Sequence, residues 1–215
     1  MKLRIFQENM AKISLIIAGA LISFSAYAEI SYQQIKQAYQ KSYQYESTEN
    51  YIDAIKAITV VHNHYKNSYT VNLRLGYLYL QQGSYANAAR HYQTAQAALP
   101  NSLSPTLGLM SVAIAQHKYN LAEELGFSIL KQDEYNYYGN LKLAYALIEN
   151  KKFANAETLL QKMLERYPEN VSFMELYAHI FAVQKMYSIA SEHYANLLIL
   201  DPENIRANYY FSLKN

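Results

Sequence analysis

The chain has 215 residues, of which 51% are hydrophobic and 17% charged, and its formal net charge at pH 7 is +2. These values are ordinary for one globular domain. Because the sequence contains no cysteine, it excludes disulfides, thiol catalysis, cysteine zinc sites and a lipid-modified cysteine after a leader.

The chain begins with a pattern typical of a secretory signal peptide, predicted over residues 1–28. An uncharged apolar run at 13–25 follows three basic residues, and the small residues Ala26 and Ala28 form a cleavage site. The run is shorter than the roughly 20 residues that span a bilayer. We therefore predict export and cleavage after Ala28. An uncleaved N-terminal anchor is the alternative, and Met10 is a second possible start for the same leader.

Cleavage would leave residues 29–215, with 16 basic and 16 acidic side chains and therefore no net formal charge. A neutral chain has no long-range attraction for nucleic acid or for an anionic membrane surface. We expect neither nucleic-acid binding nor stable membrane insertion after cleavage. The predicted location is the periplasm, where the mature chain would be a soluble protein.

Alanines recur every 34 residues through the rest of the chain, and each follows an aromatic residue by three positions. Every period contains two stretches of helical apolar spacing with a short polar turn between them. Leu75 and Tyr79 share one helical face, and Ala88 and Tyr92 share another, because residues four apart lie on the same side of a helix. Gly83 fits the left-handed turn that joins such helices. The alanines are Ala54, Ala88, Ala122, Ala156 and Ala190.

These positions resemble the tetratricopeptide repeat, a helix–turn–helix unit of 34 residues. The resemblance implies an all-α solenoid of helical hairpins in a right-handed superhelix, whose helices cross closely at small residues such as Gly76. Five hairpins and a C-terminal capping helix, about eleven helices in all, are expected. Tyr209 and Phe211 of the cap are expected to cover the last repeat. The expected repeats are at about 35–68, 69–102, 103–136, 137–170 and 171–204, with the cap at 205–215.

The third repeat departs most from this pattern. Met110 occupies the small position of its first helix, whereas Gly126 stands where an aromatic residue is usual. We interpret the pair as a size swap between the two helices. Glu134 replaces the proline that follows other second helices, so the junction after this repeat is expected to be the least regular.

Two columns of first-helix residues are expected to line the concave face, where members of this family usually hold ligands. Tyrosine suits such an interface because it combines a large flat ring with a hydroxyl group. The 23 tyrosines of the chain are equally explained as filling half-buried positions. The partner-binding residues predicted on this basis are Tyr77, Tyr145, Tyr138, His179, Leu73, Leu107 and Leu141.

The polar residues form no pattern that indicates catalysis. No phosphate-binding glycine loop, nucleophile elbow or H-E-x-x-H sequence occurs. His62 and His64 are two positions apart and cannot chelate a metal from one helical face. We interpret the histidines as structural or solvated, and Glu123 and Glu124 as a solvated pair. We predict no catalytic residue, no metal and no cofactor.

Together these features favour a non-enzymatic scaffold or adaptor of the cell envelope that binds a protein or an extended peptide through its concave groove. The alternative is a carbohydrate-handling module of an exopolysaccharide or envelope secretion system. Tyrosine rings can stack on sugars, whereas the absence of tryptophan counts against this reading. Self-assembly through end caps or convex faces is a third hypothesis.

Overall fold

The computed structural model describes residues 29–213, so the predicted signal peptide lies outside the described residues. In this range the chain forms eleven α-helices and no strand. The helices are α2 (Tyr32–Glu46), α3 (Tyr51–His64), α4 (Tyr69–Gln81), α5 (Tyr85–Ala98), α6 (Leu103–Ala115), α7 (Tyr119–Leu130), α8 (Tyr137–Glu149), α9 (Phe153–Arg166), α10 (Val171–Val183), α11 (Tyr187–Leu200) and α12 (Ile205–Ser212).

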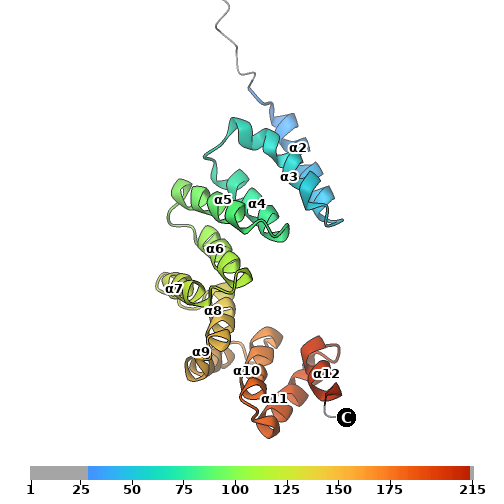
Figure 1. The fold of residues 1–215 in the computed structure, drawn as a ribbon, viewed down its shortest axis with the longest axis vertical. Coiled ribbons are helices and arrows are strands. Elements are labelled where there is room, and N and C mark those ends of the chain that lie inside the picture. Colours follow the sequence, from blue (N-terminus) through green and yellow to red (C-terminus); the bar gives the residue numbers. More distant parts are fainter. Residues whose placement is uncertain (1–28, 214–215) are drawn as a thin grey trace, which may run out of the picture.

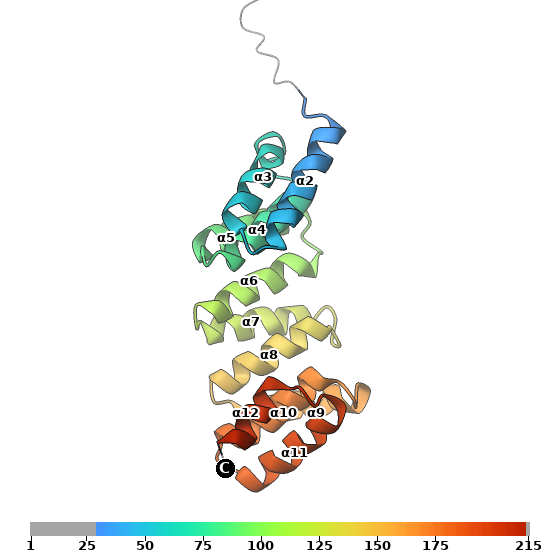
Figure 2. The same ribbon diagram turned by 90° about the vertical axis from the view of Figure 1, so that its right-hand side faces the viewer.

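Consecutive helices pair as hairpins, and the hairpins stack into an elongated array with α2 at one end and α12 near the other (Figures 1 and 2). Within the described residues α4 also contacts α6, α6 contacts α8, and α8 contacts α10, whereas no comparable contact joins α3 to α5, α5 to α7 or α7 to α9. The first helices are therefore gathered on the inner face and the second helices lie outside. The predicted all-α solenoid of five hairpins plus a terminal helix is confirmed.

Small residues let the helices of the array approach closely. All five alanines of the 34-residue register are completely buried. The ring of Tyr92, which projects from α5, lies between Gly76 of α4 and Gly108 of α6. A Cβ atom at Gly76 would come within 2.7 Å of this ring, and one at Gly108 would come closer still. The absence of a side chain at both glycines is therefore what admits the aromatic ring.

The size swap predicted in the third repeat is confirmed. Met110 is completely buried, and a Cβ atom at Gly126 would meet its terminal methyl carbon at 2.9 Å. In the third repeat the large side chain at the crossing is therefore Met110 of the first helix, α6. In the second repeat it is Tyr92 of the second helix, α5. The junction that follows is also irregular, as expected, because α7 has 12 residues whereas the other second helices have 14.

Each hairpin turns at a residue with positive φ, and these residues recur at the same 34-residue spacing. Gly83 has φ 79°, which a glycine adopts without steric cost. The other four turns place a side chain in this left-handed region, which costs roughly 1–2 kcal/mol per residue. They are Glu49, His117, Lys151 and Lys185, with φ between 56° and 62°.

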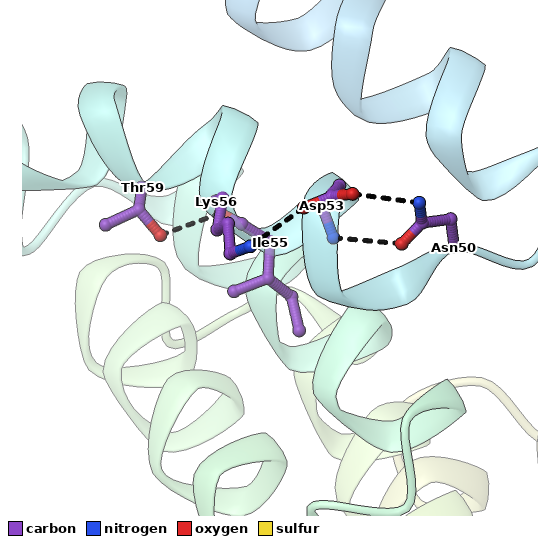
Figure 3. A network of polar contacts seen from close by, with 5 residues as sticks. All are labelled: Asn50, Asp53, Ile55, Lys56 and Thr59. Carbon is purple, nitrogen blue, oxygen red and sulfur yellow. Dashed lines mark hydrogen bonds and ion pairs between the residues drawn. The ribbon is translucent and has the colours of Figure 1, made fainter.

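The start of α3 shows how the local sequence fixes a helix end (Figure 3). Asn50 accepts a hydrogen bond at 3.2 Å from the backbone N–H of Asp53, and its amide nitrogen donates to the Asp53 carboxylate at 2.9 Å. Lys56 pairs with the same carboxylate at 2.9 Å, and this contact lowers the pKa of Asp53, followed by the contact with Asn50. Thr59 donates to the carbonyl of Ile55 at 2.7 Å one turn later. The helix therefore begins at a side-chain cap that satisfies a free backbone donor.

The C-terminal helix covers the last hairpin with Phe211, as expected, but with Tyr210 instead of Tyr209. Tyr210 and Phe211 pack beside the buried Ala207 on α11, and the rings of Tyr210 and Tyr194 lie 4.7 Å apart. Tyr209 is 63% exposed, so its predicted covering role is wrong. Neighbouring helical residues point about 100° apart, which turns Tyr209 away when Tyr210 faces the core.

The interpretation of Glu123 as solvated is also wrong. Its side chain is buried, Lys152 pairs with it at 2.7 Å, and Asn150 donates a hydrogen bond to it. Both partners belong to the following hairpin, around the turn between α8 and α9. A buried carboxylate is tolerated here because a cation and an amide satisfy it.

Candidate partner-binding groove

Three shallow concavities follow one another along the inner face, and we call them together the groove. The first, of about 520 Å³, lies between α2 and α4. The second, of about 330 Å³, is bounded by α6, α8 and α10. The third, of about 490 Å³, is bounded by α10, α11 and α12.

Five of the seven predicted partner-binding residues line these concavities. Leu73 and Tyr77 line the first, Leu141 and Tyr145 the second, and His179 the third. The other two lie elsewhere. Leu107 is half-buried against the hydrophobic core, and Tyr138 is 61% exposed beside the ring of Tyr137, with 5.1 Å between the ring centres.

The first concavity contains an arginine whose hydrogen-bonding capacity is largely used inside the protein. Arg74 donates to the hydroxyl of Ser42 at 3.2 and 3.0 Å and pairs with Glu46. Its guanidinium lies 4.0 Å from the ring centre of Tyr43 and 5.8 Å from that of Tyr77. Partial burial, and then the neighbouring Glu46, raise the pKa of Tyr77 to about 12, so its hydroxyl stays protonated at neutral pH. This end of the groove offers aromatic faces without a free charge.

The second concavity contains a lysine in a different situation. Lys142 is half-buried, and burial lowers the pKa of its ammonium group. Within residues 29–213 no acidic group pairs with it. Glu175 lines the same concavity, but its carboxylate pairs with Arg206 at 3.0 Å and accepts a hydrogen bond from Asn204 at 3.0 Å. The second concavity is therefore the electropositive part of the groove.

The third concavity is mainly apolar and aromatic. Its wall includes Tyr194, Tyr209 and Leu213, and its polar groups include His179 and Arg206. Burial, followed by the charge of Arg206, lowers the pKa of His179 to about 4, so this imidazole is neutral at pH 7. This concavity is suited to apolar or aromatic groups of a ligand.

Sequence reasoning missed the basic residues of the groove. Arg74 and Lys142 are two repeat lengths apart and so occupy the same position of their repeats. This position lies between the column of Leu73 and Leu141 and the column of Tyr77 and Tyr145. The shared position was therefore a usable signal. The sequence carries no signal that Arg74 has an acidic partner and that Lys142 has none within residues 29–213. That difference depends on which acid a neighbouring helix brings within reach.

The described residues show neither a metal cluster nor a membrane span. Between residues 29 and 213, no three His, Cys, Asp or Glu side chains come together in a way that could hold a metal ion. In the same range no helix combines the length and the apolar character needed to cross a membrane.

Comparisons with known proteins agree with this architecture. Family models described as tetratricopeptide repeat match residues 39–102 and 138–170. No curated protein shows significant sequence similarity to the chain. Similar solved structures include MamA from Desulfovibrio magneticus RS-1 (TM-score 0.68, 15% identity, covering 80% of this chain and 97% of that one) and TTC0263 from Thermus thermophilus (0.67, 14%, 82% and 97%).

A further similar structure is YrrB, described as a tetratricopeptide repeat protein with an unusual peptide-binding site (TM-score 0.64, 14% identity, covering 89% of this chain and 97% of that one). At such identities the likeness concerns the fold. The matched repeats, the 34-residue register and the stacked hairpins lead to one conclusion: the chain belongs to the tetratricopeptide repeat family.

Proposed function

We propose that this protein is a non-enzymatic scaffold that binds an extended segment of a protein partner along the groove. The observation that carries the proposal is the succession of concavities along the inner face, with aromatic side chains kept at the surface. Tyr43 is 55% exposed and Tyr77 is 36% exposed, although each ring could bury a large apolar area against a partner. A protein with a similar fold, YrrB, is described as having an unusual peptide-binding site.

An extended segment fits this surface better than a compact small ligand. The groove runs along α2, α4, α6, α8, α10 and α12, and α11 also bounds its third concavity. A peptide in extended conformation advances about 3.3 Å per residue and can place successive side chains in successive depressions. The chemistry differs between the concavities, which would allow selection among peptide sequences.

We further propose that the partner is met in the cell envelope. The support is the signal-peptide pattern of residues 1–28, followed by repeats at 35–204 and a cap at 205–215. The test is to express the full chain and measure the mass of the exported product. Loss of residues 1–28 together with recovery in the periplasmic fraction is expected. An uncleaved chain retained in the cytoplasm would contradict the proposal.

The groove itself is tested with a peptide library displayed on phage and the exported protein as bait. The double variant Tyr77→Ala, Tyr145→Ala is expected to lose the selected peptides while keeping its helical circular dichroism. The matched control, Tyr45→Ala with Tyr65→Ala, removes two exposed tyrosines outside the three concavities. This variant is expected to bind the selected peptides as the native protein does. Equal peptide binding by both double variants would show that the peptides do not bind in the groove.

The carbohydrate alternative gives a different outcome in a parallel assay. In that outcome the protein selects no peptide but binds polysaccharides on a glycan array, and the Tyr77→Ala, Tyr145→Ala variant loses that binding. This result would contradict a peptide as the ligand and would support the groove as the binding site. Binding of glycans by both double variants would contradict the groove for that class as well.

A further inference from the structure

The groove contains three basic side chains that reach its concavities, and their pairing differs. Arg74 pairs with Glu46 in the first concavity. Arg206 pairs with Glu175 at 3.0 Å on the wall between the second and the third. Lys142 has no acidic partner within residues 29–213. Within the described residues, two of the three charges are therefore paired and the charge of Lys142 is not.

The surroundings of Lys142 make this unpaired charge costly in the free protein. The side chain is half-buried, and Ile114, Leu141 and Leu176 form apolar walls of the same concavity. Removing a charged group from water without a counter-ion is unfavourable, and burial accordingly lowers the pKa of this ammonium group. An anion that enters the concavity would restore the lost solvation and would strengthen the charged form.

The shape of the site indicates what kind of anion it would take. The concavity is small, at about 330 Å³, and its other polar groups include the hydroxyls of Ser172 and Tyr145. A lysine ammonium is a compact point charge with three donors, which suits a single carboxylate. The groove continues past Lys142 in both directions, towards α2 and towards α12. A chain lying along it would therefore pass Lys142 in its interior rather than end there.

We propose that Lys142 binds the side-chain carboxylate of an Asp or Glu residue in the middle of an extended partner segment, with aromatic or apolar side chains on either side of it. The flanking preference follows from the first and third concavities, which offer tyrosine rings and apolar walls without an unpaired cation. This inference rests on the proposed function, because it specifies the partner sequence that the same groove would select.

The test uses the tightest peptide selected by the exported protein from the phage library. Its affinity is compared with that of the same peptide carrying Gln or Asn in place of the acid, for the native protein and for Lys142→Met. Methionine keeps the length of the apolar stem and removes the charge. We expect the native protein to prefer the acidic peptide at least about tenfold, and Lys142→Met to bind both peptides equally. The preference is expected to shrink in about 0.5 M salt.

Lys131→Met is the matched control, because Lys131 is exposed at the end of α7 and outside the groove. It is expected to retain the full preference for the acidic peptide. If the selected peptides lack an acidic residue, or if the preference survives Lys142→Met, this inference is overturned while groove binding stands. If no peptide binds in the groove at all, both the inference and the proposed function are overturned.

Discussion

Replacing Gly108 with alanine should destabilise the array, although alanine is the better helix former. In a free helix position the exchange favours folding by about 1 kcal/mol. Here the new methyl group would overlap the ring of Tyr92, which is 4% exposed and is confined on its other side by Gly76. Overpacking of this kind costs typically about 1–3 kcal/mol, and more where the neighbour cannot move. We expect a net loss of about 2 kcal/mol.

The assay is thermal and urea unfolding followed by circular dichroism. For a chain of this length, a loss of about 2 kcal/mol lowers the melting temperature by roughly 4–8 °C. Tyr92→Leu supplies the control, because leucine occupies the corresponding position at Leu160 and removes the ring. In that background Gly108→Ala should cost at least about 1 kcal/mol less than in the native background. A variant as stable as the native protein, or an equal loss in both backgrounds, would refute the reasoning.

Three further perturbations follow from the same structure. Lys151→Gly and Lys185→Gly should each raise stability by about 1 kcal/mol by relieving left-handed backbone, whereas Gly83→Ala should lower it by a similar amount; thermal unfolding that ranks them otherwise would contradict the turn analysis. Lys142→Met should raise the melting temperature by removing an unpaired half-buried charge, and a clear decrease would show that the ammonium has a partner. Burial, followed by the charges of neighbouring His62 and Arg90, lowers the pKa of His91 to about 4 in the folded protein, against about 6.5 when unfolded. The unfolded state then binds more protons, so stability is lost as pH falls from about 6.5 to 4, by up to about 3 kcal/mol for this residue. Urea midpoints that are equal at about pH 7.5 and pH 4.5 would contradict this.

The periodic part of the fold could be predicted from the sequence because its physical cause repeats. A small residue is needed wherever two helices cross, so the alanine register marks five crossings. The exchange of sizes between Met110 and Gly126 was visible for the same reason, since a missing small residue on one helix implies a missing large one opposite. Gly83 indicated the left-handed turn of the second hairpin. The other four hairpins form the same turn with a residue other than glycine.

Features that depend on one geometric relation between helices could not be predicted in this way. Whether Tyr209 or Tyr210 faces α11 depends on a rotation of about 100°, which a short helix of eight residues does not reveal through its pattern. Glu123 is buried because Lys152 arrives from the next hairpin. That Lys142 has no acidic partner within residues 29–213 likewise depends on the arrangement of the helices, which brings Glu175 to Arg206 and Asn204.

The most direct test of the central claim is photocrosslinking of the full exported chain in the cell, with a photoreactive residue at position 145. Position 60 serves as the control, because Val60 is 52% exposed on the second helix α3. The account predicts a discrete protein adduct from position 145 and none from position 60. An adduct from position 60 and none from position 145, in a correctly exported and folded protein, would contradict binding in the groove.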